Sequence, residues 1–72
     1  MNNIGGTALK VAKRIKAIRL EKGMTQSDVA AKADLNTNHY AKVERGEIRP
    51  TIETYERIAK ALKSKAADIF PF

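Results

Sequence analysis

Residues 25–46 read TQSDVAAKADLNTNHYAKVERG, and this stretch contains the start and stop signals of two short helices joined by a turn. Thr25 is a helix N-cap, because its hydroxyl can accept a hydrogen bond from a free backbone N–H of the first turn. Asp28 completes a capping box and places negative charge at the positive end of the helix dipole. A helix is therefore expected from about Gln26, with a break at residues 34–36.

The second helix of the pair is expected to run from about Thr37 to Arg45. Asn36 is a strong N-cap before it, and Gly46 stands where a helix commonly ends in the left-handed conformation. Its outward side chains would be polar: Thr37, Asn38 and Lys42. Such donors and acceptors suit base edges and phosphates. Two short helices joined by a tight turn are typical of a unit that places its second helix in the major groove of DNA.

Further helices are expected on both sides of this pair. One runs from about Thr7 to Lys22, and another follows the N-cap Thr51, because apolar residues recur at helical spacing in both. A short final turn is expected from Ala66 to Phe70. The apolar positions are Val11, Ile15 and Ile18 in the first helix and Ile52, Tyr55, Ile58, Ala59 and Leu62 in the second.

The sequence thus predicts an all-α fold, a compact bundle of about five short helices with one small core. Its 72 residues suit a single domain, 1–72, in which residues 1–6 are expected to be a flexible tail. That length leaves no room for a ligand-sensing domain, so no small-molecule effector is expected.

Several classes of protein are excluded by composition. Without cysteine there are no disulfides and no Cys-based zinc sites, which fits a reducing cytoplasm. No apolar run reaches the roughly 18 residues of a membrane span, and no signal peptide is evident. His39 is the single histidine and has no partner ligand, so neither a metal nor a cofactor is expected. An enzyme is not expected either, because no serine has a nearby base and no Gly-rich phosphate loop occurs.

The positive charge is concentrated near the N-terminus. The net charge is +6, of which residues 1–24 contribute +5, residues 25–46 zero and residues 47–72 +1. One interpretation is a solvated helix face. The alternative is a basic flank that attracts the phosphate backbone while neutral side chains read the bases.

Three stretches, taken in order, resemble a known family: IKAIRLEKGMTQSDVAAKADL (residues 15–35), NTNHYAKVERGEIRPTIETYERIAKAL (residues 36–62) and DIF (residues 68–70). They are similar to the lambda-repressor-like helix-turn-helix proteins of the Cro and xenobiotic-response-element type. The resemblance extends from about Val11 to Phe70. The KGMTQ and ERGE segments also resemble restriction–modification controller proteins and small phage or bacterial repressors.

This resemblance implies a lambda-repressor-like fold and a sequence-specific DNA-binding transcriptional regulator. The partners would be double-stranded DNA, read as a pseudo-palindromic operator, and a second copy of the chain. The cytoplasm, on the nucleoid, would be the location. The positions that match base contacts are Thr37, Asn38 and Lys42. Those expected to contact the DNA backbone are Arg19, Gln26, Asn36, His39, Arg45 and Arg49. Glu44 matches a structural acid that would pair with Arg14 or Arg19.

The chain departs from the family pattern at three places. Asp34 replaces the usual turn glycine, and Tyr40 replaces a branched aliphatic residue. Ser64 and Lys65 stand where a core aliphatic residue and a helix cap are usual, which predicts a last helix that is either shifted by one residue or loosely held. In many relatives that helix forms the dimer interface.

A second hypothesis is an antitoxin-like module that mainly binds another protein. The apolar segment Ile69–Phe72 is its support in the sequence. Antitoxins of this fold commonly bind DNA too, so the two hypotheses overlap.

Overall fold

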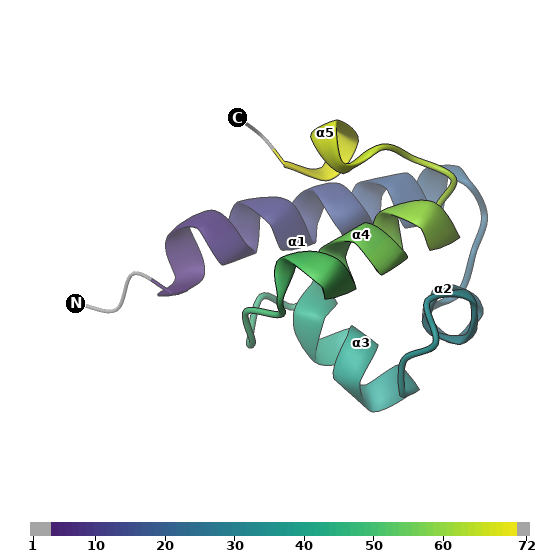
Figure 1. The fold of residues 1–72 in the computed structure, drawn as a ribbon, viewed down its shortest axis with the longest axis horizontal. Coiled ribbons are helices and arrows are strands. Elements are labelled where there is room, and N and C mark those ends of the chain that lie inside the picture. The colour runs from purple at the N-terminus through teal and green to yellow at the C-terminus, as the bar shows by residue number, and fades with distance from the viewer. Residues whose placement is uncertain (1–3, 71–72) are drawn as a thin grey trace.

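The computed structural model describes residues 4–70, and they form five helices. These are α1 (Ile4–Glu21), α2 (Gln26–Lys32), α3 (Thr37–Glu44), α4 (Ile52–Ala61) and α5 (Ala66–Ile69). Helix α5 contacts both α1 and α4, α3 contacts α1, and α2 contacts both α3 and α4. In Figure 1, α5 lies on the opposite side of α1 and α4 from the α2–α3 pair. No strand occurs between residues 4 and 70, so the predicted all-α fold of about five helices is confirmed.

The start of α1 differs from the prediction. Residues 4–6 belong to the helix rather than to a flexible tail, while residues 1–3 lie outside the described residues. The tail was predicted because Gly5 and Gly6 each disfavour a helix by about 1 kcal/mol. However, Ala8 is buried, so the first turns extend a helix that is already packed against the core, and extension adds hydrogen bonds without a new nucleation cost.

The predicted caps form as the sequence indicates. The Thr25 hydroxyl accepts from the Asp28 N–H at 3.0 Å, and the Asp28 carboxylate accepts from the Thr25 N–H at 2.9 Å. Thr51 accepts from the Thr54 N–H at 3.1 Å and caps α4. Gly46 ends α3 with φ +75°, a conformation that glycine adopts without steric cost.

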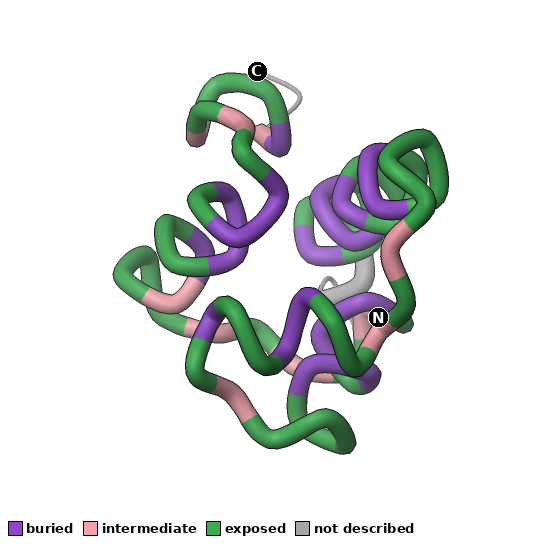
Figure 2. Tube along the Cα trace, turned by 90° about the vertical axis from the view of Figure 1, so that its right-hand side faces the viewer, coloured by how far each residue is buried: buried purple, intermediate pink, exposed green. Residues whose placement is uncertain are grey.

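The core is built from the inward faces of all five helices, as the buried stretches of the tube show (Figure 2). Its largest fully buried side chains are Tyr40, Ile15, Ile58, Leu62, Ile69, Val11, Val29 and Val43. Most are apolar positions at helical spacing, and burying one such side chain stabilises the fold by about 1.5–3 kcal/mol. The helical pair therefore sits on a shared core and is not an independent unit.

Helix α5 begins at Ala66 as predicted and is firmly attached. Lys65 provides no side-chain cap, but its N–H donates to the Asp68 carboxylate at 2.9 Å. Arg14 donates from Nε and Nη2 to the Asp68 carbonyl at 3.1 and 2.8 Å. The Phe70 ring meets Tyr55 edge to face, with ring centroids 5.3 Å apart. The expected shift or loose attachment of this helix is therefore wrong, since backbone contacts replace the missing cap.

Candidate nucleic-acid interface

The turn between α2 and α3 has the geometry of a Schellman motif. The Leu35 N–H donates to the Ala30 carbonyl at 2.8 Å, and the Asp34 N–H donates to the Ala31 carbonyl at 3.2 Å. Asp34 takes the left-handed conformation, with φ +59°, where relatives were expected to carry glycine. Asp tolerates this region better than most residues with a side chain, which is how the turn forms without glycine.

A buried polar cluster, the Glu44 network, joins α1, the start of α2 and the end of α3. The Glu44 carboxylate accepts from Arg19 Nε at 2.7 Å and Nη2 at 2.9 Å. It also accepts from the Tyr40 hydroxyl at 2.7 Å and from Gln26 Nε2 at 3.0 Å. Arg19 Nη1 donates to the Met24 carbonyl at 2.8 Å. No buried side-chain nitrogen or oxygen among the described residues lacks a partner, so the cluster is fully satisfied.

Ionisation within the network follows from these contacts. Burial opposes the charge on Glu44, but hydrogen bonds from Arg19, Tyr40 and Gln26 outweigh it and lower the Glu44 pKa. The hydrogen bond to Glu44 raises the pKa of Arg19. Burial, together with the bond to Glu44, raises the pKa of the Tyr40 hydroxyl. Arg19 and Glu44 are thus a stable ion pair, and Tyr40 remains a neutral donor.

Arg19 has a structural role in this arrangement. Its side chain is 10% exposed, and three of its five N–H donors bond to Glu44 and Met24, so we expect it to hold the fold rather than to contact phosphate. Of the two partners expected for Glu44, Arg19 is the one observed, whereas Arg14 turns to the Asp68 carbonyl on α5. The hydrogen bond from the Tyr40 hydroxyl to Glu44 was not predicted from the sequence. The signal for it was their spacing, because residues four apart on a helix lie next to each other.

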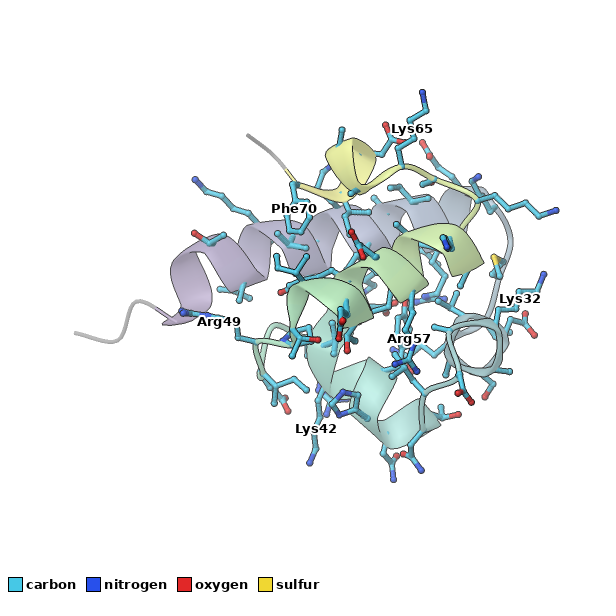
Figure 3. All side chains as sticks on the ribbon, in the orientation of Figure 1. Lys32, Lys42, Arg49, Arg57, Lys65 and Phe70 are labelled. Atoms are coloured by element: carbon cyan, nitrogen blue, oxygen red, sulfur yellow. The ribbon has the colours of Figure 1, made fainter. Side chains whose placement is uncertain are left out.

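The remaining α3 side chains expected to contact DNA are exposed. Thr37, Asn38, His39 and Lys42 all lie on its outer surface, and Lys42 extends away from the body of the molecule (Figure 3). Asn36 precedes them, and its Oδ1 accepts from the N–H groups of Asn38 and His39 at 2.8 and 3.3 Å. The first turn of α3 is therefore held rigidly by its cap while its side chains stay accessible.

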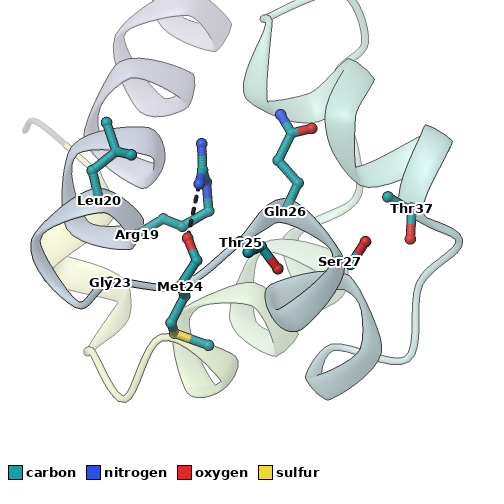
Figure 4. Close-up of a pocket in the computed structure, with 8 residues that line it drawn as sticks. All are labelled: Arg19, Leu20, Gly23, Met24, Thr25, Gln26, Ser27 and Thr37. Carbon is teal, nitrogen blue, oxygen red and sulfur yellow. Dashed lines mark hydrogen bonds between the residues drawn. The ribbon is translucent and has the colours of Figure 1, made fainter.

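An open cleft of about 570 Å³ lies where the end of α1, the start of α2 and the start of α3 meet (Figure 4). The lining residues are Arg19, Leu20, Gly23, Met24, Thr25, Gln26, Ser27 and Thr37. Gln26 and Thr37, two of the expected contact residues, are brought together here. Thr25 and Ser27, which the sequence did not single out as contact residues, line the same cleft. Their position in the first turn of α2, where backbone N–H groups are free, was the available signal.

Among the described basic groups outside α3, some make side-chain bonds within the protein and others are exposed without one. Arg45 pairs with Glu47 on the surface, with Nε 2.7 Å from Oε2, and this contact raises the Arg45 pKa and lowers that of Glu47. Arg49 is exposed. Just after α1, Lys22 Nζ donates to the Lys63 carbonyl at 3.3 Å, on the side of the α4–α5 loop. The basic residues of α1 that are exposed with no side-chain bond in the described structure are Lys10, Lys13 and Lys16. The positive charge of α1 is thus only partly available to a polyanion.

Two negative findings concern other functions. Between residues 4 and 70 no three histidine, acidic or cysteine side chains lie close enough together to hold a metal ion. Within the same residues, none of the helices has the length and apolar character needed to cross a membrane.

Comparisons with known proteins point to the same motif. The helix-turn-helix family model matches residues 15–69. The chain is 43% identical over 54 residues to the immunity repressor protein of Bacillus phage phi105, a match that covers 75% of this chain and 38% of the relative. It is 35% identical over 52 residues to the uncharacterized HTH-type transcriptional regulator y4dJ of Sinorhizobium fredii, covering 72% of this chain and 68% of that protein.

Solved structures agree with the fold. The wild-type restriction–modification controller protein C.Esp1396I superposes with a TM-score of 0.83 at 39% identity, covering 89% of this chain and 82% of that one. The controller protein C.AhdI from Aeromonas hydrophila gives a TM-score of 0.84 at 25% identity, covering 88% and 96%. The chain spans 38% and 40% of the length of two curated relatives, the phi105 repressor and the regulator DdrOP3 of Deinococcus deserti.

Proposed function

The chain belongs to the helix-turn-helix family, and from that premise we propose that it is a sequence-specific DNA-binding transcriptional regulator. The observation that carries the proposal is the exposed polar face of α3, held on a fully satisfied buried network. A recognition helix needs both properties, since base edges are read by accessible side chains in a fixed orientation. Relatives named as repressors and transcriptional regulators support the same role.

In the proposed complex α3 enters the major groove. Thr37, Asn38 and Lys42 face base edges, because they lie exposed along the outer side of that helix. Asn and Lys are side chains that pair with adenine and guanine edges, respectively, in the major groove. The proposal assigns no chemical step to the protein and no cofactor.

Backbone contacts come from the surroundings of α3. Gln26 is half-buried and uses one Nε2 hydrogen for Glu44, which leaves the second hydrogen of that amide for a phosphate in the cleft. Thr25 and Ser27 line the same cleft. The other proposed contacts with phosphate are Asn36, His39, Arg45 and Arg49, all of which are exposed. Phosphate contacts of this kind fix the register of a protein on DNA without reading its sequence.

We further propose that the protein binds as a homodimer to a pseudo-palindrome. The half-sites of such an operator lie about one helical turn, roughly 34 Å, apart. One solved neighbour, C.Esp1396I, is described as a tetramer in complex with its natural 35 base-pair operator. A regulator with this role works where the DNA is, in the cytoplasm on the nucleoid, and no small-molecule effector enters the proposal.

The antitoxin-like alternative loses part of its support. Ile69 is fully buried and Phe70 packs on Tyr55, so two residues of the apolar C-terminal segment serve the fold itself. Phe72 lies outside the described residues.

Selection of bound sequences from a random double-stranded library tests the proposal. We expect one enriched pseudo-palindromic site, and light scattering of the complex should give two chains on it. The double variant Asn38→Ala/Lys42→Ala is the control, since both side chains are exposed and the fold should survive their removal. If the unmodified protein enriches no sequence, sequence-specific binding is contradicted. If another protein then co-purifies tightly with it, the antitoxin-like alternative is favoured.

A further inference from the structure

We propose that Arg57 is a positioning residue for the recognition helix: from α4 it clamps the turn between α2 and α3 and so sets the angle at which α3 meets DNA. The effect of the clamp on DNA binding rests on the proposed function, whereas the clamp itself is a feature of the fold. It concerns a residue that is neither on α3 nor among the DNA contacts proposed above.

The clamp is made of two hydrogen bonds to consecutive carbonyls. Arg57 Nε donates to the Ala33 carbonyl at 2.9 Å, and Nη2 donates to the Asp34 carbonyl at 2.6 Å. Arg57 lies between α4 and the α2–α3 pair (Figure 3). A guanidinium presents its donors in a rigid planar fork, so two bonds fix both the distance and the orientation of the turn.

The turn needs such a partner. In the Schellman motif, the N–H groups of Asp34 and Leu35 satisfy the carbonyls of Ala31 and Ala30. The carbonyls of Ala33 and Asp34 lie further along the chain, and they accept their hydrogen bonds from Arg57. Asp34 also holds φ +59°, which is strained for a residue with a side chain. Arg57 therefore bonds to the turn at Asp34, the position where this chain carries aspartate in place of the usual glycine.

The carbonyl bonds, rather than an ion pair, carry the clamp. The Asp34 carboxylate is 3.9 Å from Arg57 Nη2 and its side chain is fully solvent-exposed, a geometry of little energetic weight. Arg57 keeps 45% of its side chain exposed, so its substitution leaves no cavity in the core. Lysine at this position would keep the charge but carry its donors on a single nitrogen, and so would lose the planar fork.

Base reading and phosphate binding respond differently to a loosened turn. Hydrogen bonds to base edges require donor and acceptor within about 0.3 Å of their ideal distance, so a small rotation of α3 removes them. Attraction to phosphates depends on charge and tolerates such a movement. Loss of the clamp should therefore lower affinity for the selected sequence far more than affinity for unrelated DNA.

The test compares the unmodified full chain with Arg57→Lys and with Lys60→Ala as the matched control. Lys60 is an exposed cation on the same helix and makes no side-chain bond in the described structure. Each variant is titrated against the sequence selected from the library and against a scrambled duplex. We expect Arg57→Lys to lose about tenfold on the selected sequence, as for a net loss of one charge-assisted hydrogen bond, and less than about twofold on the scrambled one. Lys60→Ala should lose equally on both.

Amide hydrogen exchange supplies a readout that needs no DNA. In Arg57→Lys, exchange of the Leu35 amide, which closes the turn onto Ala30, should accelerate about tenfold. The amide of Leu62, bonded to the Ile58 carbonyl in the core, should exchange at its unmodified rate and so report intact folding. An unchanged Leu35 rate, or equal losses on both duplexes, overturns the inference. If the unmodified chain selects no sequence, the proposed function fails, and the Leu35 rate alone then decides whether the clamp exists.

Discussion

Arg19 and Glu44, 25 residues apart in the chain, form a buried bidentate ion pair between α1 and α3. Their side chains are 10% and 2% exposed, and the pair ties α1 directly to the last turn of α3. A bidentate Arg–carboxylate contact restricts orientation as well as distance. The recognition helix is therefore attached to the body of the molecule by a charged contact with a defined geometry as well as by apolar packing.

Removal of one partner should be costly. Arg19→Met leaves the Glu44 carboxylate buried with hydrogen bonds but without a positive charge, and we expect the free energy of unfolding to fall by about 3 kcal/mol. Urea denaturation measures this loss. Lys16→Met on the same helix is the control, since Lys16 is exposed, and it should change stability by less than about 0.5 kcal/mol. An Arg19→Met protein that is as stable as the parent but binds all DNA weakly would return Arg19 to the phosphate contacts.

Acid should weaken the fold through Glu44. Because the network lowers the folded-state pKa of Glu44, the ionised form is favoured by folding. That stability is complete above the unfolded-state pKa of about 4.3 and is lost as the pH falls through the lower folded-state value. Asp28 and Glu47 have lowered pKa values too, so they contribute to the same trend.

The variant Glu44→Gln isolates this contribution. It should be less stable than the parent near neutral pH, and the difference in unfolding free energy between the two proteins should shrink as the pH is lowered to about 3. Urea unfolding at a series of pH values checks it. A difference that stays constant with pH would mean that Glu44 has the same pKa in the folded and unfolded states.

Features set by neighbouring residues could be predicted from the sequence, whereas contacts between residues far apart in the chain could not. Thr25 and Asn36 could be recognised as caps because a cap depends on residues within one turn. The choice between Arg14 and Arg19 as the partner of Glu44 stayed open, since it depends on how α1 is rotated against α3. The bonds of Arg57 to the turn, 23 and 24 residues away in sequence, had no local signal at all.

The proposed base contacts predict a specific pattern of losses. Asn38→Ala and Lys42→Ala should each weaken binding to the selected operator by about 1–3 kcal/mol and relax the preference at the base that each one reads. Arg49→Ala should weaken all sequences alike and reduce the salt dependence of binding, as expected for a phosphate contact. Gel-shift titrations on the operator and on single-base variants distinguish the two classes. Equal losses on every sequence for Asn38→Ala and Lys42→Ala would place both residues on the backbone.

Two glycines allow backbone strain to be separated from crowding. Gly23 and Gly46 both have positive φ, +66° and +75°, so alanine at either position carries a backbone cost of about 1–2 kcal/mol. A Cβ at Gly23 would meet nothing within 4 Å. A Cβ at Gly46 would lie 2.5 Å from Leu9 Cδ2, 3.1 Å from its Cγ and 3.3 Å from its Cα, so the Leu9 side chain would have to shift and its backbone would be closely approached.

Gly46→Ala should therefore destabilise the protein by about 1 kcal/mol more than Gly23→Ala, the excess being the cost of overpacking. Thermal and urea unfolding of the two variants measure the difference. Leu9→Ala in the Gly46→Ala background should recover most of that excess, because it removes the Cγ and Cδ2 atoms that the new methyl group would strike. Equal destabilisation by the two glycine substitutions would show that the side chain of Leu9, which is partly exposed, yields without cost and that backbone conformation alone sets the requirement for glycine.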